Sequence, residues 1–87
     1  MILAGRTAIV TGSARGIGKS IALKLAAEGA DIVLNDIQAG AEALEETAGE
    51  VRALGRRALP VIADVSVTAD VNRLVDAAVQ EFLRIDI

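Results

Sequence analysis

A glycine-rich stretch at residues 11–20, TGSARGIGKS, is the part of the sequence whose residue types and spacing indicate chemistry most directly. It carries Gly12, Gly16 and Gly18 directly after a short apolar run. Loops of this kind place backbone N–H groups at the start of a helix, where they bind phosphate. The GKS ending at 18–20 is typical of an NTPase P-loop, whereas the body of the loop is typical of a dinucleotide-binding turn.

The spacing of the glycines disfavours the P-loop interpretation. A P-loop needs G-x-x-x-x-G-K-[ST], so counting back from Gly18 places its first glycine at position 13. That position holds Ser13, and the glycine lies one place earlier, at Gly12. The extra residue matters because several consecutive N–H groups must converge on one phosphate. An apolar strand that ends in an acid, the second P-loop element, could be assigned to 59–64, but most buried parallel strands fit that description.

In the dinucleotide interpretation each glycine has its own role. Gly12 lets the chain reverse after a strand, Gly16 keeps a β-carbon away from the diphosphate, and Gly18 lets the helix lie close to the sheet. The N–H groups of the first helical turn, around Ile17, would point at the diphosphate together with the helix dipole. Asp36 ends the second apolar run 18 positions after Gly18, close to the spacing of about 20 at which a carboxylate binds the adenosine ribose. A turn residue that ends the strand is the alternative for Asp36.

The rest of the chain predicts the elements that would hold such a site. Apolar runs at 7–10, 31–36 and 57–64 indicate strands, and the amphipathic stretches between and after them indicate helices. Pro60 cannot donate a ladder hydrogen bond, so the third strand should lie at a sheet edge. Residues 85–87 resemble the beginning of a fourth strand. The order β-α-β-α-β-α-(β) predicts a partial doubly wound, Rossmann-like α/β fold with a parallel sheet covered on both faces.

Each helix should bury one apolar stripe. The stripes expected from the helical period are Ile17, Ile21, Ala22 and Leu25 in the first helix, Ala41, Leu44, Ala48, Val51 and Leu54 in the second, and Val71, Leu74, Val75, Ala78 and Phe82 in the third. Gly29 and Gly55 follow the first two helices at the position of a C-cap glycine. We expect Ser66 or Thr68 to cap the start of the third helix.

Composition restricts the class of protein. Eighty-seven residues make one small domain, which we expect to span 1–87. A net charge of −3 and a single aromatic residue, Phe82, provide neither the basic surface nor the stacking platform of a nucleic-acid-binding protein. The absence of Cys and His excludes disulfides and removes the usual zinc ligands and general base. No apolar run approaches the roughly 20 residues of a membrane span, and the start resembles no signal peptide. We therefore expect a cytoplasmic protein without a membrane or nucleic-acid partner.

Three segments together resemble the short-chain dehydrogenase/reductase family. Residues 11–18 resemble its T-G-x-x-x-G-[IL]-G signature, 63–65 are similar to its D-V pair after the third strand, and 84–87 resemble the lead-in to its fourth strand. The likeness covers all 87 residues. It is strongest to the branch that includes bacterial 3-oxoacyl-carrier-protein reductases and sugar or steroid alcohol dehydrogenases.

The resemblance implies a binding site for a nicotinamide dinucleotide. The carboxylate of Asp64 would meet the adenine amino group and the Val65 backbone would meet the ring. Asp36 should repel a 2′-phosphate and so favours NAD, whereas Arg15 lies where NADP-using members often carry a base and leaves NADP possible. The full set of residues expected to bind the cofactor is Gly12, Ser13, Arg15, Gly16, Ile17, Gly18, Asp36, Ile37, Asp64 and Val65.

The catalytic residues of the family are missing from this sequence. The family transfers hydride with a tyrosine and a lysine in a Y-x-x-x-K pair and with a serine, but this chain has no tyrosine, and Lys19 and Lys24 belong to the first helix. We therefore expect the N-terminal portion of an oxidoreductase, inactive alone, whose first strand exposes an open edge that favours a homo-oligomer. A non-enzymatic nucleotide-binding or interaction module and a P-loop NTPase fragment remain as alternatives.

Overall fold

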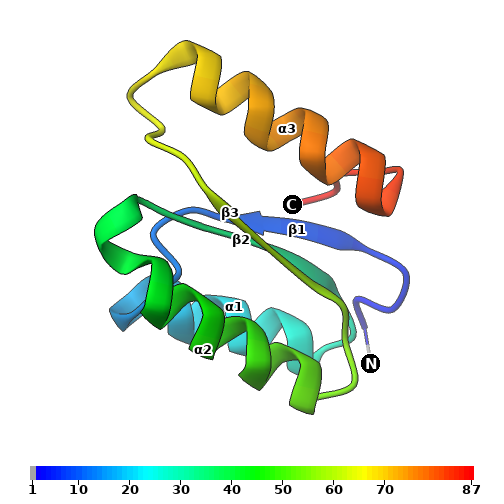
Figure 1. Cartoon of the computed structure of the whole chain (residues 1–87). Coiled ribbons are helices and arrows are strands. Elements are labelled where there is room, and N and C mark those ends of the chain that lie inside the picture. The colour runs from blue at the N-terminus through cyan, green and yellow to red at the C-terminus, as the bar shows by residue number, and fades with distance from the viewer. Residues whose placement is uncertain (1) are drawn as a thin grey trace.

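The computed structural model describes residues 2–87 and shows a three-stranded parallel sheet between two layers of helices (Figure 1). Its elements are β1 (Thr7–Val10), α1 (Gly16–Ala27), β2 (Asp31–Asp36), the 3₁₀ helix η1 (Gln38–Gly40), α2 (Ala41–Ala53), β3 (Ala58–Ile62) and α3 (Thr68–Phe82). The strand order is β1-β2-β3, with α1 and α2 on one face and α3 on the other. The predicted Rossmann-like, doubly wound architecture is confirmed.

The strands pair in a register that places their carboxyl ends at one edge of the sheet. Thr7 lies opposite Asp31 at the start of the β1–β2 pair, and Asp36 lies opposite Ile62 at the end of the β2–β3 pair. Pro60 is in β3 at the edge of the sheet, as its missing N–H predicts. Because the strands are parallel, the loops that follow them all lie at the same end of the sheet. Such loops form the usual binding crevice of this kind of fold.

The larger core lies between the sheet and the helices α1 and α2. Ile32 and Leu34 of β2 are completely buried there, together with Leu44 and Val51 of α2. The buried residues of α1 are Ala22 and Ala26, and the partly buried Leu23 and Leu25 pack against the same core. Helices that meet a sheet through side chains as short as alanine can approach it closely.

The stripe predicted for α1 was partly wrong. Ile17 is 81% exposed and Ile21 is 47% exposed, although both were expected on the buried face. The face that meets the sheet carries Ala22 and Ala26, which are four positions apart and therefore share one side of the helix.

A smaller core joins α3 to the opposite face of the sheet. Leu74, Ala78 and Phe82 of α3 pack with Val33 of β2 and Val61 of β3. These buried residues match the predicted stripe, but the prediction was wrong for Val75, which is 39% exposed. None of the helices within residues 2–87 has both the length and the apolar composition needed to cross a membrane.

The C-cap of α3 is a leucine in a conformation that suits glycine. Leu83 has φ 66° and ψ 0°, in the left-handed region, and its side chain is 84% exposed. Gly29 and Gly55, which follow α1 and α2, have φ values of 106° and 83° and confirm the predicted glycine C-caps. Leu83 adopts the same kind of turn at a steric cost that glycine avoids.

The last residues lie along the free edge of β1. The N–H of Ile9 donates to the carbonyl of Ile87 at 2.9 Å, and the N–H groups of Asp86 and Ile87 donate to the carbonyl of Thr7 at 2.8 and 3.2 Å. Ile87 thus bonds to residues on both sides of Ala8, as residues of a parallel strand pair do. The segment 85–87 is not a regular strand, but it occupies the place predicted for the start of the fourth one.

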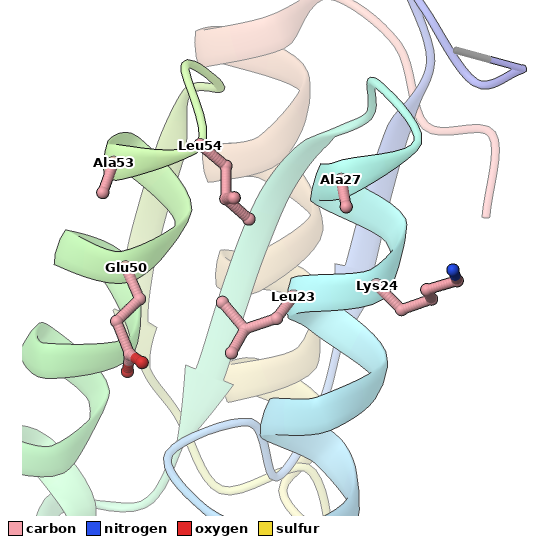
Figure 2. A pocket seen from close by; sticks show the side chains of 6 residues that line it. All are labelled: Leu23, Lys24, Ala27, Glu50, Ala53 and Leu54. Atoms are coloured by element: carbon pink, nitrogen blue, oxygen red, sulfur yellow. The ribbon is translucent and has the colours of Figure 1, made fainter.

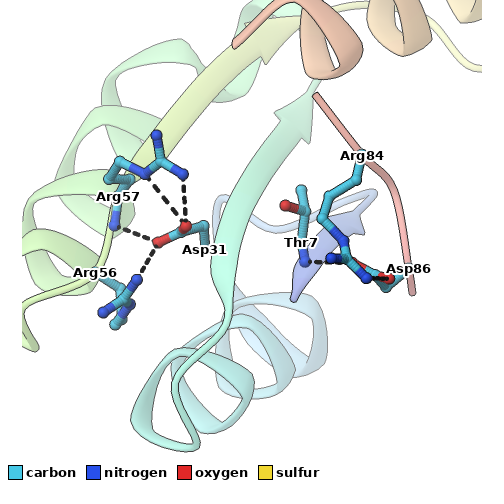
Figure 3. A network of polar contacts seen from close by, with 6 residues as sticks. All are labelled: Thr7, Asp31, Arg56, Arg57, Arg84 and Asp86. Atoms are coloured by element: carbon cyan, nitrogen blue, oxygen red, sulfur yellow. Dashed lines mark hydrogen bonds and ion pairs between the residues drawn. The ribbon is translucent and has the colours of Figure 1, made fainter. Parts of the chain in front are cut away.

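Ion pairs and hydrogen bonds join the amino ends of the strands to neighbouring segments, at the end of the sheet opposite the binding crevice (Figure 3). The buried carboxylate of Asp31 accepts bonds from the guanidinium groups of Arg56 and Arg57 and from the Arg57 N–H. Burial alone would raise the pKa of Asp31, but these bonds outweigh it and the pKa is lowered. Asp86 likewise accepts from the Thr7 N–H at 2.9 Å and from both ends of the Arg84 fork. These groups hold the strands in register.

Candidate cofactor-binding site

The glycine-rich loop turns sharply between β1 and α1. Gly12 and Gly16 have φ values of 63° and 64°, and a β-carbon at either would meet no atom within 4 Å. These glycines are therefore required by backbone conformation rather than by crowding. Gly18 has no such φ, but a β-carbon there would overlap the carbonyl oxygen of Gly12 and lie 2.8 Å from its carbonyl carbon. Gly18 consequently lets α1 pack directly on the turn that follows β1.

The first turn of α1 leaves its backbone donors open. Arg15 is the N-cap residue and no side chain caps the helix. The backbone bond nearest the helix start runs from the Lys19 N–H to the Arg15 carbonyl at 3.4 Å. Among residues 2–87, no acceptor takes the N–H groups of Gly16, Ile17 or Gly18. Free N–H groups at the positive end of a helix dipole can bind a diphosphate.

Asp36 lies at the end of β2 beside this loop. Its Oδ2 atom accepts from the Ala14 N–H at 3.1 Å and its Oδ1 atom accepts from the Ile37 N–H at 2.9 Å. A carboxylate has about four lone-pair sites, so acceptor capacity remains on both oxygens. A cavity of about 380 Å³ opens here, lined by Arg15, Asp36, Ile37, Ala39 and Gly40. The carboxylate and the glycine loop therefore border the same space.

A second cavity adjoins the first and contains Asp64. It has a volume of about 410 Å³ and shares Ile37 and Ala39 with the first cavity, and its remaining lining residues are Gln38, Ile62, Ala63, Asp64, Asp70 and Arg73. Val65, the next residue, is half exposed. Together the two cavities form a continuous surface across the carboxyl ends of β2 and β3, where the loops after parallel strands usually bind ligands.

The loop that carries Asp64 is held by hydrogen bonds to Asp70 and from Ser66. Asp70 Oδ2 accepts from the Asp64 N–H at 2.8 Å, and Asp64 Oδ1 accepts from the hydroxyl and the N–H of Ser66 at 2.6 and 2.9 Å. The bonds from Ser66, its hydroxyl first, lower the pKa of Asp64 below its ordinary value. The predicted cap of α3 was wrong, because neither Ser66 nor Thr68 bonds the helix start and Val67 is the N-cap residue. Ser66 is engaged by Asp64 instead.

Ser13 differs from the other residues predicted to bind the cofactor. It is completely buried, and its hydroxyl accepts from the Asn35 N–H at 3.0 Å and donates to the Asn35 carbonyl at 3.4 Å. The Ser13 N–H also donates to that carbonyl at 2.9 Å. The side chain of Ser13 thus fastens the glycine loop to β2, and a direct cofactor contact for it stays a prediction.

Two buried polar residues of this region were missed in the sequence. Asn35 donates from its side-chain amide to the carbonyls of Val61 and Ala63, both at 3.1 Å, and so joins β2 to the loop after β3. Thr47 of α2 donates to the carbonyl of Ala14 at 3.1 Å. The available signal was a polar side chain among apolar ones, in a strand for Asn35 and on the buried side of a helix for Thr47.

The lysine that suggested a P-loop points to another helix. The Lys19 ammonium lies 2.6 Å from the carboxylate of Glu50 in α2. A P-loop lysine must instead reach the phosphates over the loop. The structure therefore gives this interpretation no geometric support.

A third cavity, of about 540 Å³, is unrelated to the predicted site. Figure 2 shows it between α1 and α2, lined by Leu23, Lys24, Ala27, Glu50, Ala53 and Leu54. The first three residues belong to the second half of α1 and the other three to the end of α2, away from the glycine loop at the start of α1. The side chains of Leu23 and Leu54 point into the space between the helices, whereas the ammonium of Lys24 points away from it. The cavity therefore does not present the donors that a diphosphate requires.

The predicted residues therefore gather at one edge of the sheet, at the carboxyl ends of all three strands. The fold and this arrangement of loops define a Rossmann-like α/β unit. A model of the short chain dehydrogenase family matches residues 6–87. The chain belongs to this family and corresponds to an N-terminal portion of its members. The predicted resemblance is confirmed.

Three similar proteins illustrate the match. The hydroxynaphthalene reductase-like protein Arp2 of Metarhizium anisopliae is 45% identical over 85 residues, which are 98% of this chain and 32% of that protein. A blue fluorescent protein from a metagenomic library, solved in complex with NADPH, is 36% identical with a TM-score of 0.94 over 99% of this chain and 35% of its own. An NAD⁺-bound xylitol dehydrogenase is 37% identical with a TM-score of 0.92 over 99% of this chain and 32% of its own. The chain spans about a third of the length of these proteins.

Proposed function

We propose that this chain binds the adenosine diphosphate portion of NAD. In this proposal it is the cofactor-binding portion of an oxidoreductase that moves a hydride between nicotinamide and a carbonyl or alcohol substrate. The observation that carries the proposal is the position of the Asp36 carboxylate. It is bonded to the glycine loop at Ala14 and lines one cavity with Arg15, the N-cap residue of α1, a helix whose first N–H groups are open. The ribose hydroxyls need a hydrogen-bond acceptor, and the diphosphate next to them needs hydrogen-bond donors.

Each part of the cofactor has a group that suits it. The diphosphate accepts from the N–H groups of Gly16 and Ile17, and the absence of a β-carbon at Gly16 leaves room for it. The ribose hydroxyls donate to the lone pairs that remain on Asp36. The adenine lies in the adjoining cavity, where Asp64 accepts from its amino group and the Val65 backbone meets its ring.

The charges around the first cavity favour NAD over NADP. A 2′-phosphate would bring its negative charge close to Asp36, and like charges placed together are unfavourable. Arg15 lines the same cavity and offers a cation for such a phosphate. Relatives with each cofactor are known, one solved with NADPH and another with NAD⁺. We propose NAD as the preferred cofactor, with weaker binding of NADP through Arg15.

We further propose that the 87 residues do not reduce or oxidise a substrate by themselves. The cofactor supplies the hydride, but another group must protonate the substrate oxygen and position the substrate. The sequence contains neither tyrosine nor histidine for that step. Ketone reduction by the purified chain with NADH would contradict this proposal. Activity restored by a carboxy-terminal piece carrying a Y-x-x-x-K pair would distinguish the enzyme portion from a non-enzymatic binding module.

Fluorescence titration tests the binding proposal. We expect NADH emission to rise on addition of the chain, with saturation by a single site, and ADP-ribose to compete for it. Magnesium-dependent ATP binding that disappears in Lys19→Ala would favour the P-loop alternative instead. No change with NADH, NADPH or ADP-ribose would overturn the proposed function.

We also propose self-association through the side of the molecule that carries β1 and α3. Apolar side chains of Val79, Ile85 and Ile87 are 40–50% exposed there, and only part of the β1 edge is covered by residues 85–87. Open parallel edges next to apolar surface favour pairing with another chain. Light scattering at tens of micromolar, roughly the lower range in which exposed apolar surface drives aggregation, should give more than the monomer mass. A clean monomer would contradict the proposal.

A further inference from the structure

Thr47 lies in the middle of α2, yet it contacts the glycine loop 33 positions earlier in the chain. Its side chain is completely buried, and its hydroxyl is 3.1 Å from the carbonyl oxygen of Ala14 and 3.2 Å from that of Ala43. A hydroxyl has one hydrogen to donate. Ala43 is four residues before Thr47 in the same helix, so its carbonyl already accepts the backbone N–H of Thr47. The carbonyl of Ala14 accepts no backbone N–H among residues 2–87, and it therefore depends on the hydroxyl.

The bond from Thr47 fixes the orientation of one peptide plane in the loop. The Ala14 carbonyl and the Arg15 N–H belong to the same trans peptide and point in opposite directions. Because the carbonyl points into the protein toward Thr47, the Arg15 N–H points outward. No acceptor within residues 2–87 takes that N–H. It therefore joins the open N–H groups at the start of α1.

The preceding peptide plane is fixed in the same manner from β2. The Ala14 N–H donates to Asp36, so Ala14 is bonded on one side by a strand and on the other by a helix. Gly40, at the start of α2, completes the enclosure, because a β-carbon there would lie 3.3 Å from the Ala14 β-carbon and 3.2 Å from Asp36 Cγ. The segment is thus held on several sides in ligand-free protein.

We infer that Thr47 is a positioning residue for the diphosphate, which turns the Arg15 N–H toward the bound cofactor without touching it. This inference rests on the proposed function. Two properties follow. Loss of the hydroxyl disturbs the loop in the absence of any ligand, and it weakens ligands that contain a diphosphate more than ligands that do not.

The experiment compares Thr47→Val, which keeps the shape and loses the hydroxyl, with Thr47→Ser, which retains the hydroxyl. Thr68→Val, at an exposed helical position, is the matched control for the chemical change. In the ligand-free chain we expect the NMR amide signals of Arg15 and Gly16 to shift in Thr47→Val and to remain near their wild-type positions in the other two variants. Unshifted signals in Thr47→Val would overturn the inference, whatever the outcome of binding measurements.

Binding to two probes supplies the second readout. We expect Thr47→Val to weaken ADP-ribose about tenfold, which corresponds to the loss of one hydrogen bond, and to leave the affinity for adenosine unchanged. Thr47→Ser should bind both probes like the wild type. Equal losses for the two probes would show a general structural role and overturn the inference. If wild-type protein binds neither probe, the proposed function fails, and the ligand-free NMR comparison still decides whether Thr47 orients the loop.

Discussion

The carboxylate of Asp36, at the end of β2, accepts a hydrogen bond of 3.1 Å from the backbone N–H of Ala14, in the middle of the glycine-rich loop. This bond joins the group proposed to bind the ribose to the loop proposed to bind the diphosphate. The two parts of the site therefore form one hydrogen-bonded unit before any cofactor arrives. A site arranged in advance loses less conformational freedom when its ligand binds.

Asp36→Ala should change which cofactor binds better. We expect NADH affinity to fall by about tenfold to a hundredfold, because hydrogen bonds to a charged group contribute about 1.5–3 kcal/mol. NADPH affinity should fall much less or increase, since the charge that repels the 2′-phosphate is removed and Arg15 remains. Fluorescence titration with both reduced cofactors measures the ratio. Asp76→Ala, at an exposed position of α3, is the control; equal losses for NADH and NADPH would contradict the assigned role of Asp36.

Two glycine-to-alanine substitutions should have opposite effects on stability. In Gly18→Ala the new methyl group meets the backbone of Gly12, so we expect the free energy of unfolding to fall by roughly 1–3 kcal/mol, the usual cost of overpacking. Gly49 lies within α2 with open space around a β-carbon, and Gly49→Ala should gain up to about 1 kcal/mol from helix propensity. Urea unfolding of both variants measures the difference. Similar values for the two would show that the close approach of α1 to the turn is unimportant.

Leu83→Gly should stabilise the protein. Leu83 has φ 66°, and its side chain is almost fully exposed, so little apolar contact is lost on removal. Glycine relieves the left-handed strain, but its greater freedom in the unfolded chain offsets part of this gain. The net result should be a rise in the free energy of unfolding of about 0.5–1 kcal/mol. Leu83→Ala keeps the strain and serves as the control, with an expected change near zero. Thermal unfolding that ranks the alanine variant above the glycine variant would contradict this account.

Acid should release the final residues from β1. The hydrogen bonds from Arg84, followed by that from the Thr7 N–H, lower the pKa of Asp86 to about 2. Because the pKa is lower in the folded protein than in the unfolded chain, the contribution of this group to stability is complete above about pH 4 and is lost as the pH falls through about 2. NMR titration should show the Thr7 amide signal moving with that midpoint. In Asp86→Asn this movement should disappear, and a midpoint near 4 in the wild type would contradict the proposed bond.

Much of the fold was predictable because its signals are local. The apolar runs, the glycine C-caps and Pro60 each reflect the conformation or hydrogen bonding of their own segment, and Pro60 also placed the third strand at an edge of the sheet. The spacing between the glycine loop and Asp36 could be recognised for a similar reason, since a β-α-β unit fixes the separation of its two strands. The structure then placed both at one cavity.

The features that were missed depend on contacts between distant segments. Thr47 meets Ala14 across 33 positions, and nothing near Thr47 in the sequence indicates that contact. The helical period placed Ile17 and Ile21 on the buried face of α1, but the residues of that helix that pack on the distant strands are Ala22 and Ala26. Leu83 is a local exception, because it occupies a conformation that its own side chain disfavours and that residue propensity does not predict.

The middle position of β2 in the sheet also affects the local opening of the strands that carry the candidate site. This strand is bonded on both sides, and its residues Ile32, Val33 and Leu34 have no exposed surface. Local opening requires exposing such residues to water, so their amides should exchange hydrogen for deuterium more slowly than those of β1 or β3. Asp36 is carried by the segment that opens last, while the flanking loops remain free to fluctuate around it.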